Sequence, residues 1–200
     1  MIDINYMKKT KRLVIRPYNL NDYDSWKKAF SSVQKAQNQW DKGPRDISEL
    51  TKSNFRKILS QQKKHRSDDV FYDLIAFDKK SEEIVGFSAL MDITRNVFQN
   101  AYLGYGVLNT KWGKGYGKEI VKATMQIAFS EIDLHRVEAG IEPKNKRSIA
   151  LAKSCGMRRE GLSKRRLYLG GEWKDMAIYA MTADEMGFKG HTGKPTGARR

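Results

Sequence analysis

The apolar residues of the chain follow two different periods, which predicts a mixture of strands and helices. Apolar or alternating runs predict strands at residues 13–16, 70–77, 84–91, 101–108 and 136–141, then a hairpin of residues 162–169 and 172–181. Apolar residues three and four apart predict helices after Asn21, after Gly117 and over 145–155. A strongly basic helix is also predicted after the break at Gly43-Pro44, with Leu50, Phe55, Ile58 and Leu59 on its inward face. Asn21 and Gly156 are the expected N-cap and C-cap of the first and last helices, and Gly170-Gly171 the expected hairpin turn.

This order of elements predicts an α+β fold with a mixed, mostly antiparallel sheet. A meander of strands comes first, and a single strand–helix–strand crossover lies in the middle of the chain. We expect about seven strands flanked by helices, in one domain spanning residues 1–186. Residues 187–200 lack a core-forming pattern and carry four Lys and Arg with no acid, so we expect a disordered basic tail.

The charge balance changes what the chain is expected to bind. Thirty-eight Lys and Arg oppose 23 Asp and Glu, which gives a formal net charge of +15. Nucleic acid, an anionic membrane surface or a polyanionic cofactor would each suit this charge. Part of the excess lies in residues 51–66, where six Lys and Arg occur with no acid. A solvated helix face is the simpler interpretation of that run.

Several absences narrow the class of protein. No segment approaches the ~20 apolar residues of a membrane-spanning helix, and the N-terminus lacks an apolar signal core. The single cysteine, Cys155, excludes an internal disulfide, and a buried packing thiol is its expected role. His65, His135 and His191 lack metal-ligand spacing. We therefore expect a cytoplasmic protein with no metal and no membrane partner.

A glycine-rich turn at residues 113–117 follows a predicted strand and leads into a helix. The first N–H groups of a helix are unpaired and lie at the positive end of its dipole, so this turn is typical of an anion site. Lys111, Lys114 and Lys118 add positive charge. The spacing fits neither the phosphate loop G-x-x-x-x-G-K-S/T nor the dinucleotide motif G-x-G-x-x-G.

The turn resembles the pyrophosphate loop of the GNAT acetyltransferases, Q/R-x-x-G-x-G/A. Gly115 and Gly117 match its small positions, while Trp112 stands where Gln or Arg is usual. A second element of that superfamily, N-x-x-S/A-x-x-L followed by G-F, is similar to Asn145, Ser148 and Leu151 followed by Gly156-Met157. The resemblance covers nearly the whole chain and implies the GNAT fold.

Further matches indicate the RimJ/RimL subgroup, whose members acetylate protein N-termini. Gly171–Asp175 resembles that subgroup's G-x-W-x-D, and Arg159-Glu160-Gly161 opens the last hairpin in the same way. The resemblance implies acceptor-binding roles for Trp40, Tyr105, Trp173 and Asp175. For Trp173, a place in the core of the hairpin is the alternative.

The resemblance also implies acetyl-CoA as co-substrate. Backbone N–H groups of the loop would bind its pyrophosphate, through residues Trp112, Gly113, Lys114, Gly115, Tyr116, Gly117 and Lys118. The N–H groups near Val107 would stabilise the acetyl oxygen as negative charge develops on it. Asn145 and Ser148 would contact the pantetheine arm, although Asn145 could equally cap its helix.

Three residues are candidates for catalysis. Glu160 is the candidate general base, acting through water, with Tyr105 in reserve. Ala152 stands where many GNAT enzymes have a tyrosine acid, so Ser148 is the candidate partner of the thioester sulfur. The alternatives are structural: Glu160 could pair with Arg158 or Arg159, and Ser148 could be an ordinary helix serine.

These features predict direct attack by a primary amine on acetyl-CoA in a ternary complex. The expected acceptor is the N-terminal α-amino group of a ribosomal or other protein, with ribosomal RNA as a possible contact of the basic surface. One alternative is a small-molecule amine, such as an antibiotic or a polyamine. Another is an inactive GNAT-fold module that binds RNA, although no RNA-binding motif with interleaved aromatics is visible. The enzyme is expected to be a monomer or a homodimer.

Overall fold

The computed structural model describes residues 6–188. Within this range the predicted α+β class is confirmed, with eight strands in one mixed, mostly antiparallel sheet and four α-helices. The extra strand, β1, has only two residues, Lys8–Lys9, which pair with Val14 and Ile15. No helix in this range is long and apolar enough to cross a membrane. The elements are β1 (Lys8–Lys9), β2 (Leu13–Arg16), α1 (Tyr23–Ser31), α2 (Lys52–Ser67), β3 (Phe71–Asp78), β4 (Ile84–Thr94), β5 (Asn100–Val107), α3 (Tyr116–Ser130), β6 (Arg136–Ile141), α4 (Lys146–Ser154), β7 (Arg158–Leu169) and β8 (Glu172–Thr182).

The chain divides into two compact units, each described by itself. The first unit contains residues up to Ala89 together with Tyr105–Thr124, and the second contains Leu90–Gly104 and the chain from Met125. Strands β4 and β5 and helix α3 have residues in both units.

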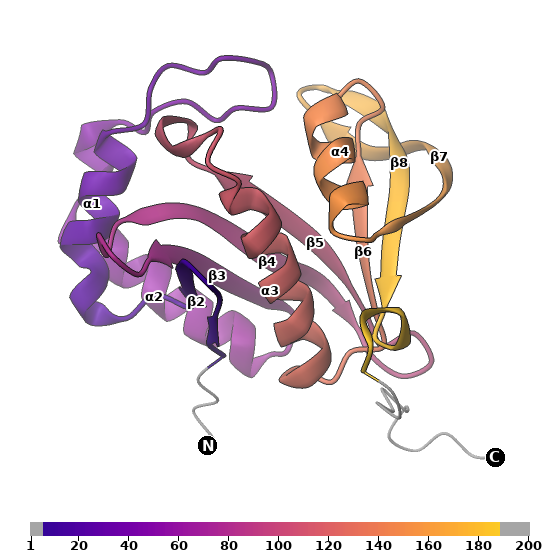
Figure 1. The fold of residues 1–200 in the computed structure, drawn as a ribbon. Coiled ribbons are helices and arrows are strands. Elements are labelled where there is room, and N and C mark those ends of the chain that lie inside the picture. Colours follow the sequence, from indigo (N-terminus) through magenta and orange to yellow (C-terminus); the bar gives the residue numbers. More distant parts are fainter. Residues whose placement is uncertain (1–5, 189–200) are drawn as a thin grey trace. The chain divides into compact units, whose positions relative to one another are not determined.

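In the first unit, α1 and α2 lie side by side (Figure 1), and aromatic residues of both helices belong to one buried core. The rings of Trp26 and Phe55 lie 5.1 Å apart and both side chains are almost fully buried. The predicted basic helix is present as α2, and it begins at Lys52, where the Thr51 hydroxyl accepts a hydrogen bond from the N–H of Asn54. Leu50, expected on the inward face of this helix, is buried but precedes it. The predicted N-cap at Asn21 is wrong: Asn19 caps a single 3-10 turn that precedes α1.

A glycine that the sequence reasoning did not single out brings β4 and β5 close together in the first unit. A Cβ atom on Gly86 would lie 2.4 Å from the carbonyl oxygen of Gly106 and 2.8 Å from Cδ1 of Ile120. Only glycine fits at such a distance from a neighbouring backbone. Gly86 therefore sets the spacing of the two strands where β5 runs toward the glycine-rich turn.

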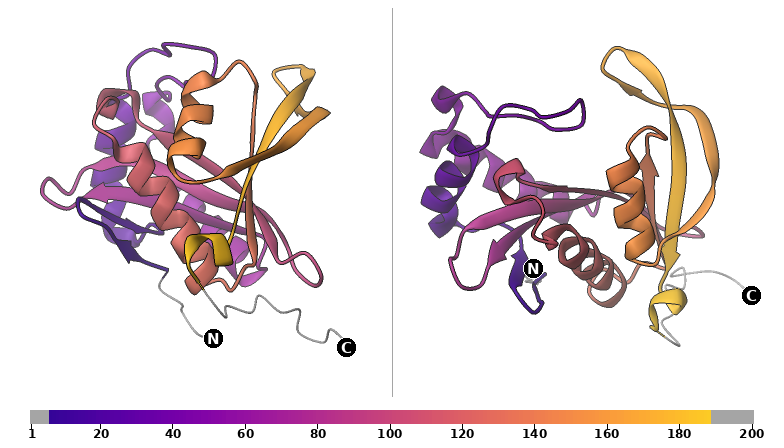
Figure 2. Two further views of the ribbon diagram at one scale, coloured as in Figure 1. Left: turned by 45° about the vertical axis from the view of Figure 1, so that its right-hand side comes forward. Right: turned by 45° about the horizontal axis from the view of Figure 1, so that its top comes forward.

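In the second unit, β6 pairs with β5 in parallel and with β8 in antiparallel fashion, and β8 pairs with β7. Strand β6 has the predicted bounds, whereas β7 begins at Arg158, four residues before the prediction. Residues 158–161 are mostly charged, and they can form a strand because β7 is exposed along most of its length. Figure 2 shows β7 and β8 running side by side to the turn at Gly170-Gly171.

Candidate functional site

The glycine-rich turn lies in the first unit and leads into α3, as predicted, although α3 already begins at Tyr116, inside the predicted turn. Gly113 and Gly115 have φ angles of 76° and 74°, a region that favours glycine. A Cβ on Gly113 would have no neighbour within 4 Å, and one on Gly115 would have only the guanidinium of Arg12, at 3.6 Å. Residues 113–115 are exposed. The turn therefore presents open backbone next to a helix N-terminus, which fits a pyrophosphate group.

Arg12 holds this turn in place. Its Nη1 donates to the carbonyl oxygen of Lys114 at 2.7 Å, its Nε donates to Glu119, and its guanidinium lies 4.6 Å from the centre of the Tyr116 ring. The Tyr116 hydroxyl in turn donates to Asp78 at 3.0 Å, which raises the pKa of the tyrosine. The sequence reasoning missed Arg12, because it is about a hundred residues away along the chain.

Trp112 replaces the usual Gln or Arg of the loop and has a definite contact. Its indole N–H donates to the carbonyl oxygen of Val107 at 2.8 Å, which ties the end of β5 to the turn. Val107 and Tyr105 are both half-buried in β5. Gly106 between them faces the ring of Phe87, which a Cβ would approach to 2.5 Å. The contact explains how the loop keeps its shape with tryptophan at this position.

Asn109 joins the turn to the loop that carries Trp40, and the sequence reasoning missed it too. Its side chain is only 6% exposed and makes hydrogen bonds of 2.9 Å and 2.7 Å with the backbone N–H and carbonyl of Gln34. Its amide also donates to Asp41 at 3.0 Å. Trp40 itself is 37% exposed. The predicted acceptor residue Trp40 is thus held on a loop fastened to the start of the glycine-rich segment.

The positive charge of Lys111 is paired with the carboxylate of Glu83. It forms ion pairs with Lys111 at 2.6 Å and with Lys28 at 2.8 Å. The hydrogen bond from Lys111, supported by the one from Lys28, lowers the pKa of Glu83 from 4.5 to about 2. Lys114 and Lys118 are exposed. They are better placed than Lys111 to attract a phosphate.

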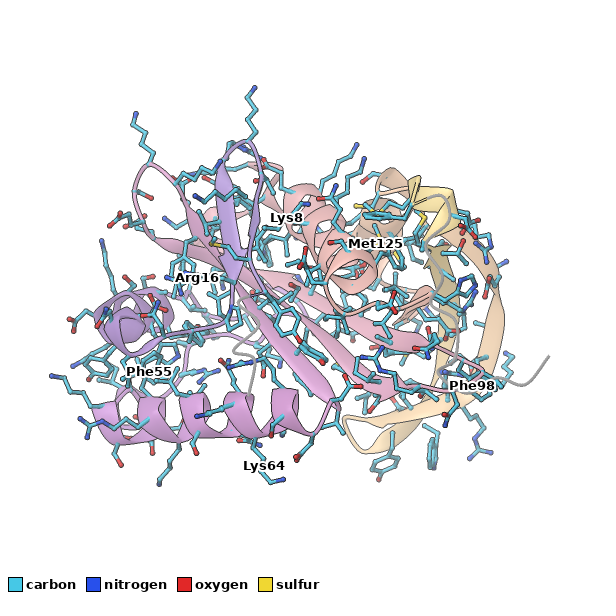
Figure 3. All side chains as sticks on the ribbon, turned by 90° about the horizontal axis from the view of Figure 1, so that it is seen from below. Lys8, Arg16, Phe55, Lys64, Phe98 and Met125 are labelled. Atoms are coloured by element: carbon cyan, nitrogen blue, oxygen red, sulfur yellow. The ribbon has the colours of Figure 1, made fainter. Side chains whose placement is uncertain are left out.

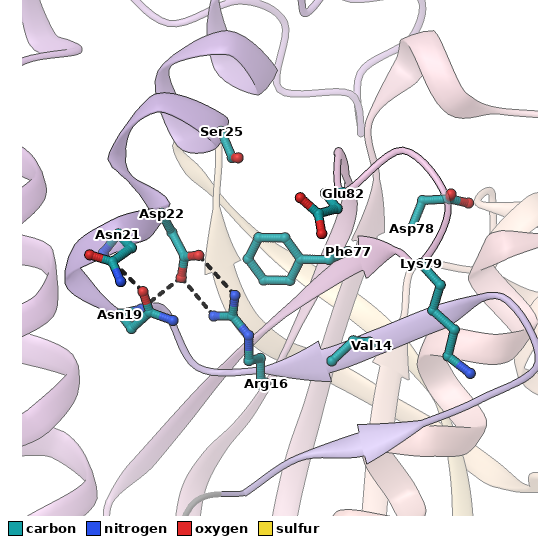
Figure 4. A pocket seen from close by; sticks show the side chains of 10 residues that line it. All are labelled: Val14, Arg16, Asn19, Asn21, Asp22, Ser25, Phe77, Asp78, Lys79 and Glu82. Carbon is teal, nitrogen blue, oxygen red and sulfur yellow. Dashed lines mark hydrogen bonds and ion pairs between the residues drawn. The ribbon is translucent and has the colours of Figure 1, made fainter.

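A hollow of about 420 Å³ also lies in the first unit, between β2, the end of β3 and the start of α1 (Figure 4). Arg16 dominates it, but both terminal nitrogens of Arg16 bind the carboxylate of Asp22, at 2.6 Å and 2.8 Å. The guanidinium also lies 4.1 Å from the ring centre of Phe77. None of the residues predicted to bind or react lines this hollow. We assign no chemistry to it.

In the second unit, Asn145 caps α4. Its side-chain oxygen accepts a hydrogen bond from the N–H of Ser148 at 3.1 Å. Capping was one of the two roles that the sequence left open for Asn145. Ser148 is half-buried in the first turn of α4, and Ala152 is fully buried one turn later.

Glu160 lies in β7 within a cluster of arginines. Its carboxylate accepts hydrogen bonds from Arg136, at 3.0 Å for one oxygen, and from Arg158 at 2.7 Å. The hydrogen bond from Arg136 is the main cause that lowers the pKa of Glu160 below its ordinary value. A general base for an amine needs a raised pKa rather than a lowered one. These contacts favour the structural interpretation, with Arg158 and Arg136 as the partners.

Trp173 and Asp175 lie on β8 with different surroundings. Trp173 is 53% exposed and meets Tyr168 of β7 edge-to-face, with ring centres 5.6 Å apart, so it is not a core residue of the hairpin. Asp175 accepts hydrogen bonds from the Lys164 ammonium and the Arg165 N–H, both at 2.9 Å. Arg165 has a φ of 48°, and the strand pairing is irregular there. Asp175 therefore anchors the bulge of β7.

The other singled-out residues have local structural roles. Cys155 is a buried thiol at the end of α4 and forms no disulfide. The N–H of His135 donates to the carbonyl of Gln99 at the start of β6. Residues 6–188 hold no group of three or more His, Cys, Asp or Glu that could bind a metal ion. His191 and most of the predicted basic tail lie outside the described residues.

Comparison with known proteins identifies the family. Residues 12–158 match the acetyltransferase (GNAT) domain. The chain is 31% identical over 180 residues to the ribosomal protein uS5-alanine N-acetyltransferase of Escherichia coli (strain K12). The aligned residues cover 88% of this chain and 90% of that protein. The fold is similar to the ribosomal-protein-S5-alanine acetyltransferase of Vibrio fischeri, with a TM-score of 0.71 and 22% identity over 89% of this chain and 97% of that one. It is also similar to Mycobacterium smegmatis RimJ in complex with CoA-disulfide, with a TM-score of 0.71 and 23% identity over 88% and 84% of the two chains.

Proposed function

The chain belongs to the GNAT family of acetyltransferases, and from that premise we propose that it transfers the acetyl group of acetyl-CoA to the N-terminal α-amino group of a ribosomal protein. The open glycine-rich turn at the start of α3 carries the proposal, since its backbone suits a pyrophosphate group. The relative in Escherichia coli, which matches over nine-tenths of its own length, acetylates an alanine of protein uS5. An N-terminal alanine is therefore the first acceptor to test.

The reaction needs one new bond. The neutral amine nitrogen attacks the thioester carbonyl, a C–N bond forms, and the C–S bond breaks to release the thiolate of coenzyme A. Backbone N–H groups near Val107 are the proposed donors to the oxygen that becomes negative in the transition state. The thiolate then takes a proton, and the amine nitrogen loses one.

The proton of the attacking amine needs an acceptor. The arginines on Glu160 make that carboxylate a weaker base, so we propose that Glu160 serves mainly as an ion-pair partner. The proton would then pass to solvent water, with Tyr105 of β5 as the side-chain candidate. Predicted contacts of Ser148 with the sulfur and of Asn145 with the pantetheine arm stay predictions.

An acceptor panel tests the proposal. The purified protein is incubated with acetyl-CoA and three acceptors: a peptide with a free N-terminal alanine, the same peptide with a blocked N-terminus, and spermidine. We expect the mass of one acetyl group to be added to the free peptide alone. Preferential acetylation of spermidine would show that the acceptor is a polyamine and not a protein N-terminus. Acetylation of the blocked peptide would show that the enzyme acetylates a lysine side chain of the peptide and not its N-terminus.

A further inference from the structure

Helix α2 carries an exposed face on which basic and hydroxyl side chains are arranged in rows. Successive residues of an α-helix turn by about 100°, which places Lys52, Arg56 and Lys63 in one row and Lys57 and Lys64 in another, within an arc of about 140°. Ser53, Ser60 and Ser67, spaced seven residues apart, run between the two rows. All eight residues are exposed. The face therefore offers cations on both sides of a line of hydroxyl groups.

Most of this charge is available for a partner. Within residues 6–188, no ion pair involves Arg56, Lys57 or Lys63. Lys64 pairs with Asp68, one turn further on, at 2.5 Å. The sixth basic residue of the run, Arg66, is half-buried. Its positive charge opposes the rise in the pKa of Asp73 of β3 that burial causes, so Arg66 does not belong to this face.

The packing of α2 holds the face outward. Phe55 and Gln62 are buried on the opposite side, and Ile58 and Leu59 are partly buried against the same core. Figure 3 shows Phe55 directed toward α1 and Lys64 directed away from it. No large apolar side chain lies on the exposed face of α2. A surface helix that enters a membrane interface needs such side chains, so the face does not suit a membrane.

A hollow beside the first half of α2 adds a second feature. It measures about 430 Å³ and is lined by Leu20, Asn21, Tyr23, Asp24, Lys52, Phe55 and Arg56. Its wall combines the aromatic ring of Tyr23, over which the Lys52 ammonium lies at 5.5 Å from the ring centre, with the Arg56 cation and one carboxylate, that of Asp24. A base that stacks on Tyr23 would take the place of the Lys52 ammonium. RNA-binding surfaces combine the same two elements, because unstacked bases stack on aromatic side chains while cations bind the phosphates.

We propose that the exposed face of α2 binds the sugar-phosphate backbone of RNA, with the adjoining hollow receiving an unstacked base. The inference deepens the proposed function, on which it rests, because a ribosomal acceptor is surrounded by RNA. The α2 face would raise the local concentration of the enzyme at that acceptor, while the glycine-rich turn binds acetyl-CoA.

The test measures binding of the full chain to a labelled RNA hairpin with an unpaired loop. Binding of the wild-type protein should fall steeply with salt, since each phosphate contact adds about 0.7–0.9 to the slope of log K against log salt. The triple variant Arg56→Gln, Lys57→Gln, Lys63→Gln should bind at least tenfold more weakly and lose roughly one unit of slope for each contact removed.

A matched control removes the same charge elsewhere in the first unit, through Lys27→Gln, Lys35→Gln and Lys80→Gln, which are all exposed. It should retain most of the RNA affinity. Equal weakening by the two triple variants, or salt-insensitive binding, would overturn the proposal. So would wild-type binding to phosphatidylserine vesicles without binding to the hairpin. Acetylation of a free alanine peptide should be unchanged in the α2 variant, and its absence in the wild type would contradict the proposed function instead.

Discussion

Replacing Gly115 by valine should weaken acetyl-CoA binding while leaving the protein folded. Gly115 has a φ of 74°, and an L-residue in that region costs on the order of 1–2 kcal/mol. The residue is exposed, so the turn can relieve the strain by rotating its backbone. That rotation would turn the N–H groups away from the pyrophosphate, and the branched side chain would stand in its path. We expect at least a tenfold loss of affinity, about 1.4 kcal/mol.

The chain offers a control with the same local strain. Gly170, in the turn between β7 and β8, has a φ of 59° and no atom within 4 Å of an added Cβ. Gly170→Val should therefore lower stability by an amount similar to Gly115→Val. It should leave acetyl-CoA affinity unchanged, because it lies outside the glycine-rich turn.

Isothermal titration calorimetry with acetyl-CoA measures the affinity, and thermal unfolding shows that both variants are folded. The reasoning predicts weak binding for Gly115→Val alone. A folded Gly115→Val protein that binds acetyl-CoA with wild-type affinity would refute the assignment of the turn to the pyrophosphate. Equal losses of acetyl-CoA affinity in the two variants would show that backbone strain in general, and not the position of Gly115, weakens binding.

Three further predictions concern side-chain contacts. Glu160→Gln should keep near wild-type turnover at neutral pH, and a turnover deficit that shrinks as pH rises would instead restore Glu160 as the general base. Asn109→Ala should cost about 1–3 kcal/mol in urea unfolding, because it leaves buried backbone groups of Gln34 unpaired, and should raise KM for the peptide more than that for acetyl-CoA. Since the pKa of Glu83 is lowered to about 2, its pair with Lys111 stabilises the fold above about pH 4.5 and loses this effect as pH falls toward 2. Glu83→Gln should make the melting temperature depend less on pH between about 4.5 and 2. A pH dependence identical to that of the wild type would contradict the stabilising role of the Glu83–Lys111 pair.

Local patterns were enough to predict much of the fold. The alternation in residues 136–141 gave the bounds of β6, and the spacing of glycines gave the turn before α3. The run of charged residues 158–161 hid the start of β7, because an exposed strand does not need apolar side chains. Asn19 and Asn21 both suit an N-cap, and the choice between them depends on where the 3-10 turn begins.

Long-range contacts could not be predicted from the same patterns. Arg12 meets Lys114 and Glu119 across more than a hundred residues, and one sequence contains no signal for that pairing. The partners of Glu160 show the limit most clearly. Arg158 is close to Glu160 in sequence and is therefore an expected partner. Arg136 comes from a different strand, and its hydrogen bond is the largest influence on the pKa of the carboxylate.

The central claim, acetylation of a ribosomal protein N-terminus, is tested most directly in cells. Mass spectrometry of ribosomal proteins from cells with and without this chain reports the acetylation state of every N-terminus. We predict one N-terminus, beginning with alanine, that carries an acetyl group in the first cells and a free amine in the second. Identical N-terminal acetylation of all ribosomal proteins in the two samples would contradict the claim.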